Sequence, residues 1–337
     1  MSSQAMIVLA ADVGGTHTKL AVAQVAAGAL ALIRRDVYSS QAYPSLESIV
    51  ETFLSHPDLA SRAASVAGAC FAVAGPVEGG CARLTNVAWD IDQTSLARYF
   101  SIPRVSVIND FAAAGVGIEQ LGERDFLTLQ EGVLLERADR VVVGAGTGLG
   151  VAWLTWSEGR YYVHPSEGGH ADFAPVDAVQ DELLVHLRRE FGRVSYERVL
   201  SGPGLPRIFN FLKQRGPIEP TDALLNAMTV GDAAGAITEF ALSHRDAVAE
   251  HALDMFASAY GAFAGNMALT ALAHGGIYVA GGIAPKIAAK LTDGTFMRAF
   301  MAKGRMRAVL EKIPVKVVMN EQVGPMGALA EAARIAK

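Results

Sequence analysis

The chain has 337 residues, and this length predicts two domains because a single hydrophobic core rarely serves more than about 250–300 residues. Hydrophobic residues make up 51% of the chain and aromatic residues 7%, which is typical of a soluble globular enzyme with an aliphatic interior. The net charge of −5 and the lack of any run of basic residues argue against a nucleic-acid-binding surface.

The N-terminal residues predict a strand and no targeting signal. The apolar stretch from Met6 to Ala11 has no charged region before it and ends at Asp12. We therefore expect a cytoplasmic protein. The sequence contains two cysteines, Cys70 and Cys81, and we expect both to be reduced packing residues, since two cysteines cannot form a structural zinc site by themselves.

The first third of the chain predicts an antiparallel opening to a mixed α/β sheet. The pattern of apolar residues indicates a hairpin from Ile7 to Val25 and a third strand from Ala31 to Tyr38. In chain order, the next expected elements are a helix at 45–54 capped by Ser45, a buried strand at 66–73, a locally paired segment at 81–84, a capped helix at 92–100 and a strand at 104–108. Strands that alternate with helices place ligand sites at the strand C-termini.

The rest of the chain is expected to repeat this theme from Arg140 and then to become mostly helical. The helix expected from Met255 to Ala273 has fewer than the ~18 uninterrupted apolar residues that a membrane span requires, so we expect it to be buried or to face a second subunit. The other expected elements are a hairpin around 157–160, a helix at 177–191, a strand at 276–282, a helix from about 285, a strand at 315–319 and a helix from 325.

Two glycine-rich turns, Asp12 to Thr16 and Gly144 to Gly150, each follow an apolar strand and precede a second apolar run. Glycine leaves no Cβ between backbone N–H groups and an anion, and Thr16, Thr18 and Thr147 add hydroxyl donors. Neither turn matches the Rossmann or the P-loop pattern. One such turn alone is more often an ordinary hairpin, but their repetition predicts a two-part phosphate clamp.

Carboxylates stand at the ends of two predicted strands. Asp12 directly precedes the glycines, where a hydrated divalent cation on a polyphosphate needs an oxygen ligand. Asn109-Asp110 ends a later strand, and a carboxylate there can accept a proton from an alcohol that attacks a phosphoryl group, while the neighbouring amide orients that alcohol. The alternative is that Asp110 only caps the helix that begins at Phe111.

Three further polar residues lie in glycine-rich or turn contexts. Glu167 and His170 share one loop, and such a carboxylate and imidazole fit the adjacent hydroxyls of a sugar, each a donor and an acceptor. Glu197 follows in a later segment. The alternatives are a His170 bonded only to backbone and a surface Glu197 paired with Arg193 or Arg198. A metal site is disfavoured because no second histidine or cysteine lies at ligand spacing.

Seven short motifs occur in order along the chain, at residues 11–16, 84–89, 108–113, 144–150, 167–175, 197–204 and 281–283. Together they resemble the bacterial glucokinase family, in the actin, hexokinase and Hsp70 superfamily of ATPases, and the resemblance covers nearly the whole chain. It implies an α/β fold of two ribonuclease-H-like (actin-like ATPase) domains around a central cleft. The smaller domain would comprise residues 1–120 and 318–337, and the larger one residues 121–317 with helical insertions.

The resemblance also implies a reaction, the ATP-dependent phosphorylation of D-glucose at O6 with Mg²⁺ as cofactor and Asp110 as general base. It implies that the other sugar hydroxyls are held by Asn109, Glu167, His170 and Glu197. The implied ATP contacts are Ala11, Asp12, Val13, Gly14, Gly15, Thr16, Gly146, Thr147 and Gly148 at the phosphates and Gly281 and Gly282 at the adenosine, with Asp12 also near the hydrated Mg²⁺. A homodimer without membrane association is implied as well.

The chain departs from the family pattern in its first turn. After Thr16 it has His17, Thr18 and Lys19, where the family usually has Asn, Ala and Arg; this bears on nucleotide affinity but not on phosphate contacts made by the backbone. The related repressor, open-reading-frame and kinase family carries a cysteine-rich zinc motif after its Glu-x-Gly-His. Here residues 171–175 lack cysteine, which favours the zinc-free glucokinase branch.

Three alternatives stay open at this point. The first is a kinase for another hexose or amino sugar, since hydroxyl contacts set that choice. The second is a non-catalytic sugar-sensing regulator, which would need a DNA-binding helix pair where only about ten residues precede Asp12. The third is an ATP-gated module of the actin or chaperone type, which would not need the cluster of Glu167, His170 and Glu197. The choice between ATP and polyphosphate as donor also stays open.

Overall fold

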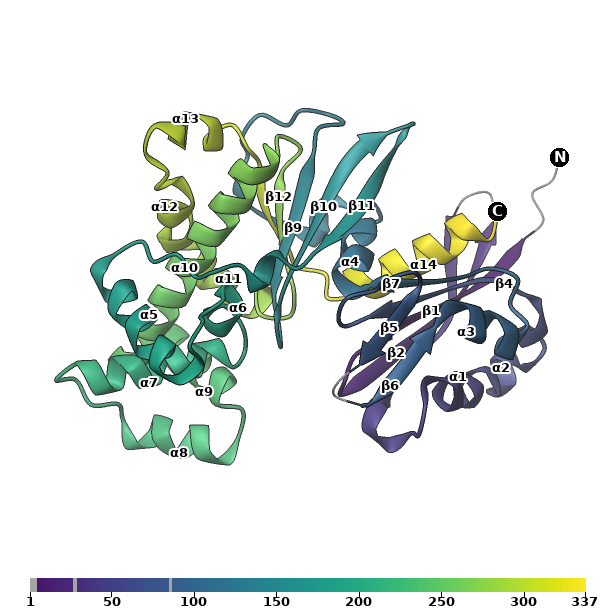
Figure 1. The fold of residues 1–337 in the computed structure, drawn as a ribbon, viewed down its shortest axis with the longest axis horizontal. Helices are drawn as coiled ribbons and strands as arrows, with labels where there is room; N and C mark the ends of the chain where they lie inside the picture. Colours follow the sequence, from purple (N-terminus) through teal and green to yellow (C-terminus); the bar gives the residue numbers. More distant parts are fainter. Residues whose placement is uncertain (1–4, 27–28, 85–86) are drawn as a thin grey trace. The chain divides into compact units, whose positions relative to one another are not determined.

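A computed structural model describes residues 5–26, 29–84 and 87–337 of the chain. Two compact units make up the fold, one formed by Met1–Gly122 with Gln322–Lys337 and the other by Glu123–Glu321 (Figure 1). The C-terminal helix therefore belongs to the same unit as the N-terminal strands. Each unit has its own mixed sheet and its own hydrophobic core.

The first unit contains a five-stranded sheet in the order β3-β2-β1-β4-β7. The strands β1 (Met6–Val13), β2 (His17–Ala26) and β3 (Ala29–Ser39) pair antiparallel, which confirms the predicted hairpin and third strand. Next to β1, the strands β4 (Val66–Val73) and β7 (Val105–Asn109) run parallel to it. The C-terminal ends of β1, β4 and β7 consequently lie at one edge of the sheet.

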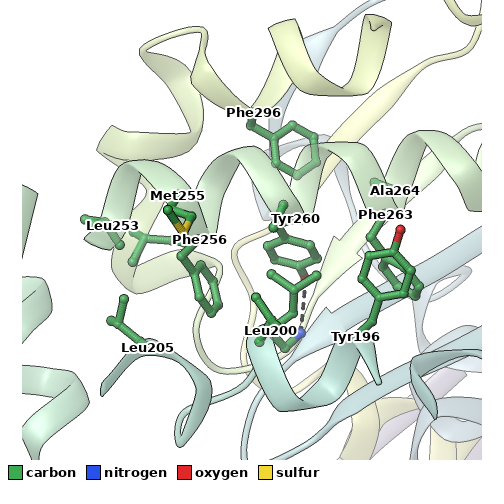
Figure 2. Close-up of a cluster of buried hydrophobic side chains, with 14 of the residues drawn as sticks. Tyr196, Leu200, Leu205, Leu253, Met255, Phe256, Tyr260, Phe263, Ala264 and Phe296 are labelled. Carbon is green, nitrogen blue, oxygen red and sulfur yellow. Dashed lines mark hydrogen bonds between the residues drawn. The ribbon is translucent and has the colours of Figure 1, made fainter. Parts of the chain in front are cut away.

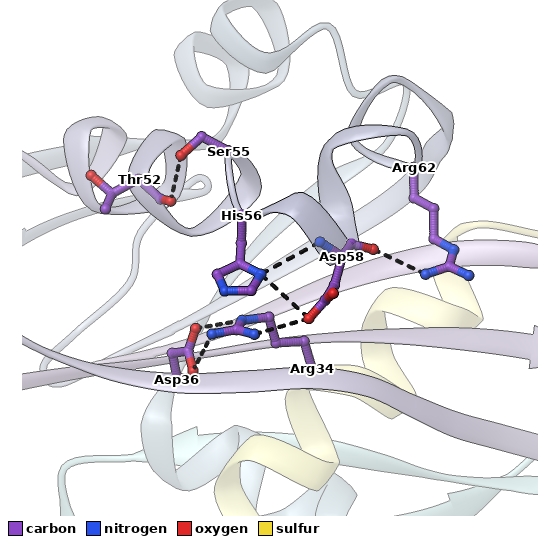
Figure 3. A network of polar contacts seen from close by, with 7 residues as sticks. All are labelled: Arg34, Asp36, Thr52, Ser55, His56, Asp58 and Arg62. Atoms are coloured by element: carbon purple, nitrogen blue, oxygen red, sulfur yellow. Dashed lines mark hydrogen bonds and ion pairs between the residues drawn. The ribbon is translucent and has the colours of Figure 1, made fainter.

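One face of this sheet packs on short helices with side-chain N-caps. The helix α1 (Leu46–Leu54) is capped by Ser45 and α3 (Gln93–Phe100) by Asp92, as predicted. The helix α2 (Pro57–Ala60) lies between them in sequence and is tied to β3 by polar contacts (Figure 3). Other elements here are 3₁₀ segments and the two-stranded ribbon of β5 (Cys81–Leu84) and β6 (Trp89–Asp92).

The polar network in Figure 3 centres on Arg34 of β3. Its guanidinium donates to Asp36 at 2.7 Å and to Asp58 at 3.2 Å, and the Nδ1 atom of His56 lies 3.3 Å from the same Asp58 carboxylate. The Asp58 side chain is 62% exposed. Because solvent screens exposed ion pairs, each contributes little to stability, so this network positions α2 without dominating stability.

The two cysteines differ in environment, and both are free thiols. Cys70 is fully buried, and burial raises the pKa of its thiol well above the usual value. Cys81 is exposed and donates to a carboxylate oxygen of Asp92 at 3.1 Å, a hydrogen bond that raises its pKa as well. Neither thiol is therefore an activated nucleophile.

The opposite face of the first sheet is covered by α4 (Asp110–Ile118) and the C-terminal α14 (Val323–Ile335), seen side by side in Figure 1. Their backbones approach through glycines. A Cβ atom at Gly327 would overlap the carbonyl oxygen of Ala113, and one at Gly117 would overlap that of Val323. This close crossing fixes α4, whose first residue is Asp110.

Gly327→Ala is therefore expected to destabilise the fold by roughly 1–3 kcal/mol, because an overpacked contact against rigid backbone has no flexible group to move aside. Gly324→Ala, on the same helix, is the matched control, since a Cβ atom there would meet no neighbouring atom within 4 Å. Chemical denaturation of the two variants and the parent measures the difference. Equal stability of the two variants would contradict the close crossing.

The second unit contains a six-stranded sheet in the order β11-β10-β9-β12-β13-β8. Its strands are β8 (Phe126–Gln130), β9 (Arg140–Ala145), β10 (Leu149–Ser157), β11 (Arg160–Ser166), β12 (Ile277–Ala280) and β13 (Val315–Val318). An antiparallel β11-β10-β9 meander is followed by β12 parallel to β9 and β13 parallel to β12, the same arrangement as in the first sheet. In the structure the first glycine turn is Gly14–Thr16, between β1 and β2, and the second is Gly146–Gly148, between β9 and β10, so the two turns occupy equivalent places.

The helices of the second unit are α5 (Ala178–Phe191), α6 (Tyr196–Val199), α7 (Gly204–Arg215), α8 (Asp222–Val230), α9 (Ala233–Leu242), α10 (Ala247–Ala271), α11 (Ala288–Thr292), α12 (Thr295–Met301) and α13 (Arg307–Leu310). The expected helix from Met255 begins earlier, at Ala247, because Asp246 caps it by accepting from the Ala249 N–H. Most of its side chains from Val248 to Ala268 are buried, as expected. Within the described residues, no helix is long and apolar enough to cross a membrane.

An aromatic cluster centred on α10 supports the second glycine turn (Figure 2). Tyr260 is fully buried between Phe256 and Phe296, and its hydroxyl accepts a 3.0 Å hydrogen bond from the backbone N–H of Ala145, at the end of β9. Burial raises the pKa of Tyr260, so this hydroxyl remains protonated at neutral pH. The core of the unit thereby fixes the residue directly before the turn.

Candidate active site

The first glycine turn joins β1 to β2 at the edge where β1, β4 and β7 end. Gly14 donates its N–H to the carbonyl of His17 at 3.0 Å, which closes the turn. The carbonyls of Gly14 and Thr16 both accept hydrogen bonds from Ser40, in the 3₁₀ turn after β3. In the part of the chain that the structure describes, the N–H groups of Gly15 and Thr16 donate to no protein atom, so they are available to an anion.

The second turn, between β9 and β10, repeats this arrangement. Gly146 donates its N–H to the carbonyl of Gly148 at 2.8 Å, and its own carbonyl accepts from the N–H of Gly202 at 2.7 Å. The N–H groups of Thr147 and Gly148 donate to no atom among the described residues. Thr147, like Thr16 in the first turn, has an exposed side chain. Each turn therefore presents two unpaired N–H groups and one exposed hydroxyl.

A third glycine pair follows β12, next to the second turn. Gly281 has φ +84°, and a Cβ atom there would lie 2.5 Å from the carbonyl oxygen of Ala145. The N–H of Ile283 donates to that same oxygen at 3.2 Å. Gly281 is thus required for packing against the end of β9, whereas Gly282 faces open space. Of the two, only Gly282 leaves room for a ligand.

Asn109 and Asp110 lie at the end of β7, in register with the end of β4. Asn109 is the N-cap of α4: its side-chain oxygen accepts from the N–H groups of Phe111 and Ala112, and its amide donates to the carbonyl of Gly75 at 3.0 Å. Asp110, half-buried, accepts from the N–H of Phe111 with one carboxylate oxygen. Because Asn109 is the N-cap residue, capping alone does not account for Asp110.

Glu167, His170 and Glu197 lie together in the second unit. The Nε2 atom of His170 is 3.7 Å from Glu167, and its Nδ1 atom is 4.0 Å from Glu197. Their side chains are 54%, 58% and 32% exposed in the order His170, Glu167 and Glu197. Arg193 donates to the carbonyl of His170 and pairs with Asp172 at 2.7 Å, which holds the loop in place. An imidazole between two carboxylates offers donors and acceptors to neighbouring hydroxyls.

Glu197 also contacts the second glycine turn directly. One carboxylate oxygen accepts a 3.0 Å hydrogen bond from the N–H of Leu149, the residue after the turn, and a Cβ atom at Gly148 would lie 2.5 Å from that oxygen. A Cβ atom at Gly169, in the loop of His170, would overlap the carbonyl of Leu149. The carboxylate and imidazole cluster therefore packs directly against the second turn, within the second unit.

The Asp12 carboxylate faces Lys19 across the β1–β2 pair. The two residues are opposite in the register, and the Lys19 ammonium lies 3.0 Å from Oδ2 of Asp12. The Asp12 side chain is 23% exposed, so it is partly accessible to solvent. Mg²⁺ typically binds one or two protein carboxylates together with waters and substrate phosphates. The Asp12 carboxylate fits such a cation, because it lies beside the first glycine turn, whose N–H groups are available to an anion.

No cluster of three or more histidine, cysteine, aspartate or glutamate side chains able to hold a metal ion occurs within residues 5–26, 29–84 and 87–337.

Comparisons with known proteins agree along the whole chain. The family model described as Glucokinase matches residues 9–335. A glucokinase from a Nostoc species is 41% identical, with 98% of this chain and 99% of that protein covered. The chain belongs to the glucokinase family. Among solved structures, a glucokinase from an Antarctic psychrotroph has a TM-score of 0.82 at 30% identity, covering 97% of this chain and 99% of that one.

The glucokinase family has the actin-like ATPase fold with two α/β domains, and the fold class predicted from the sequence is confirmed. A ROK family glucokinase from Streptomyces griseus, solved in complex with glucose and AMPPNP, has a TM-score of 0.64 at 21% identity over 97% of this chain and 99% of its own. The equivalent strand order in the two units is the internal repeat that the paired glycine turns indicated.

One expectation at the first turn of this glucokinase family member is wrong. Thr18 was expected to offer its hydroxyl to phosphate, but its side chain is fully buried and hydrogen-bonded to Ser40 at 3.0 Å. The cause is the alternation of side chains along β2: its first residue, His17, is exposed, so the next residue, Thr18, points inward.

Sequence reasoning also missed three residues at the glycine turns. Ser40 and Gly202 hold the two turns from distant segments, and no local pattern marks them. Lys19 lies opposite Asp12 because the hairpin turns at Gly15 and Thr16, whereas a turn at Gly14 and Gly15 would place His17 there.

Proposed function

We propose that this protein transfers the γ-phosphoryl group of ATP to O6 of D-glucose, giving glucose 6-phosphate and ADP. One observation carries the proposal: each unit combines a glycine turn that has unpaired N–H groups with polar side chains suited to a sugar. The first unit contains Asp110, and the second contains the cluster of Glu167, His170 and Glu197. Membership of the glucokinase family supports it, as does the glucose and AMPPNP complex of the Streptomyces griseus protein.

Asp110 is the proposed general base. The 6-hydroxyl oxygen attacks the γ-phosphorus as its proton passes to the carboxylate of Asp110, and the bond from the γ-phosphorus to the bridging oxygen of ADP breaks. The Asp110 carboxylate accepts from the N–H of Phe111, and Asn109 is fixed by its cap bonds and by Gly75. This leaves the second amide hydrogen of Asn109 as the group that would orient a hydroxyl.

The phosphates of ATP are proposed to bind the unpaired N–H groups of the two turns, Gly15 with Thr16 and Thr147 with Gly148. Bound Mg²⁺ would neutralise phosphate charge, with Asp12 as its nearest carboxylate, through water. Lys19, which already pairs with Asp12, adds a positive charge at the same turn. Rate enhancement would come from positioning and charge neutralisation, as in phosphoryl transfer generally.

The remaining glucose hydroxyls are proposed to bind Glu167, His170 and Glu197. The carboxylates accept from hydroxyls, and the imidazole donates or accepts according to its tautomer. The adenosine is assigned to the backbone at Gly281 and Gly282, with the open side at Gly282. The two compact units are proposed to be the two catalytic domains. The cytoplasmic location and the homodimer stay predictions.

The proposal is tested by coupled measurement of ADP release from Mg-ATP with a panel of glucose, mannose, fructose and N-acetylglucosamine, repeated with polyphosphate as donor. We expect the highest kcat/KM for glucose with ATP. A higher value for another sugar would reassign the substrate, and sugar binding without any ADP release would favour a non-catalytic sensor. If no sugar increased ADP release, the kinase function would be refuted.

A further inference from the structure

Two hydroxyl side chains are fully buried beneath the first glycine turn. Thr18 on β2 and Ser40 in the 3₁₀ turn after β3 both have no exposed surface, and their oxygens lie 3.0 Å apart. Burying a hydroxyl costs free energy unless it is hydrogen-bonded. This pair is hydrogen-bonded, and Ser40 in addition bonds the glycine turn.

Ser40 is a double donor to the turn. Its Oγ donates to the carbonyl of Gly14 at 2.7 Å, and its backbone N–H donates to the carbonyl of Thr16 at 2.9 Å. A serine hydroxyl has one hydrogen, which Ser40 gives to Gly14. The contact with Thr18 must therefore run the other way, from the hydroxyl of Thr18 to the oxygen of Ser40. The result is a directed chain from Thr18 through Ser40 to Gly14.

This chain fixes the direction of a single peptide plane. The carbonyl of Gly14 and the N–H of Gly15 belong to one planar trans peptide, so they point in opposite directions. A peptide between two glycines rotates at little steric cost, because neither residue has a Cβ. When Ser40 holds the carbonyl on the buried side, the N–H of Gly15 is held on the opposite side, where it has no protein partner among the described residues.

The second turn shows the same solution with a different donor. There the N–H of Gly202 donates to the carbonyl of Gly146 at 2.7 Å, which holds the N–H of Thr147 in the opposite direction. Both turns thus restrain the carbonyl of their first glycine from a neighbouring segment. The second turn does so with backbone, and the first does so with a side chain that a substitution can remove.

We infer that Thr18 and Ser40 are positioning residues for nucleotide binding, which preset the Gly14–Gly15 peptide so that the N–H of Gly15 faces the phosphates of ATP. Neither side chain touches the nucleotide. The inference rests on the proposed use of this turn for ATP phosphate. Without the hydroxyl chain, part of the binding free energy would be spent on turning the peptide.

Ser40→Ala is expected to raise the Kd for AMPPNP and the KM for ATP by roughly 3- to 10-fold, the effect of one neutral hydrogen bond. The KM for glucose should change less than about 2-fold, since the sugar contacts are elsewhere. Thr18→Val is nearly isosteric and should also raise the KM for ATP and the Kd for AMPPNP, whereas Thr18→Ser, which keeps the hydroxyl, should leave both near their wild-type values. In the double variant Ser40→Ala/Thr18→Val the two effects should not add, because both residues act through one chain.

Ser45→Ala is the matched control. It removes a serine that caps α1 in the same unit and whose side chain, within the described residues, has no hydrogen bond to the turn. We expect it to lower Tm and leave the KM for ATP unchanged. If Ser40→Ala and Thr18→Val lowered Tm in the same way without changing the KM for ATP or the Kd for AMPPNP, the positioning role would be refuted and the pair would be structural only.

The two proposals fail in different ways. A wild-type protein that releases no ADP in the presence of glucose refutes the kinase function, whatever Ser40→Ala does. If the wild type is active, and Ser40→Ala and Thr18→Val have the same KM for ATP and Kd for AMPPNP as the wild type, only the role of the hydroxyl chain is refuted.

Discussion

Asp110→Asn is expected to lower kcat for glucose phosphorylation by about 10²–10⁴-fold, the usual contribution of a general base. The amide oxygen of asparagine can still accept from the N–H of Phe111, so the first turn of α4 and the shape of the site are retained. The amide cannot take the proton of the 6-hydroxyl. The loss should therefore appear in kcat, with the KM values for glucose and ATP changed little.

Steady-state kinetics with both substrates varied measures this effect, and thermal denaturation shows that the variant is folded. Asp58→Asn is the matched control, since it makes the same change in the same unit at a 62% exposed side chain in the network of Figure 3. It should leave kcat unchanged. Turnover by Asp110→Asn within a few-fold of the wild-type value would show that another group accepts the proton.

Local signals in the sequence were sufficient for much of the fold. Alternating apolar residues on either side of glycines predicted both hairpins, and Ser45 and Asp92 marked helix starts because their side chains cap N–H groups within three residues. These features depend on neighbours along the chain. For the same reason, the position of Asp110 at a strand end could be predicted, since it needs only the order of strand and helix.

Helix boundaries in the second unit were harder to predict. The apolar run beginning at Met255 concealed the first two turns of α10, whose start is set by Asp246, and α7, α8 and α9 were not separated in advance. The starts of α8 and α9 do carry local signals, since the side chains of Thr221 and Asp232 cap them by accepting from backbone N–H groups. These caps were not recognised because the surrounding residues do not show a regular apolar period.

In the candidate site, contacts between residues distant in sequence could not be predicted. For Glu197, the residues alone favoured a surface pair with Arg193 or Arg198, but Arg193 pairs with Asp172 and Arg198 stacks on Phe191. Glu197 instead bonds Leu149, far away in sequence. Ser40 likewise reaches Gly14 only because β3 returns beside β2. Such contacts depend on register between strands and loops, which a single sequence does not specify.

Glu197→Ala is expected to raise the KM for glucose by roughly 10- to 100-fold, as for a lost charge-assisted hydrogen bond, and to raise the KM for ATP as well. The second effect follows from the 3.0 Å bond to Leu149, because its loss leaves the end of the second glycine turn unsupported. Glu167→Ala is the matched control. The Glu167 side chain pairs with His170 and, among the described residues, has no hydrogen bond to the turn, so only the KM for glucose should rise.

Glu197→Gln separates the two roles of this side chain. Its amide keeps an oxygen that can accept from the N–H of Leu149, so the KM for ATP should return toward the wild-type value. The lost negative charge should keep the KM for glucose high, since the carboxylate no longer accepts from hydroxyls with full strength. If Glu197→Ala left the KM for ATP unchanged, the bond to Leu149 would not support the turn. A rise in that KM for Glu167→Ala would mean that the sugar cluster affects ATP through the whole loop and not through Glu197.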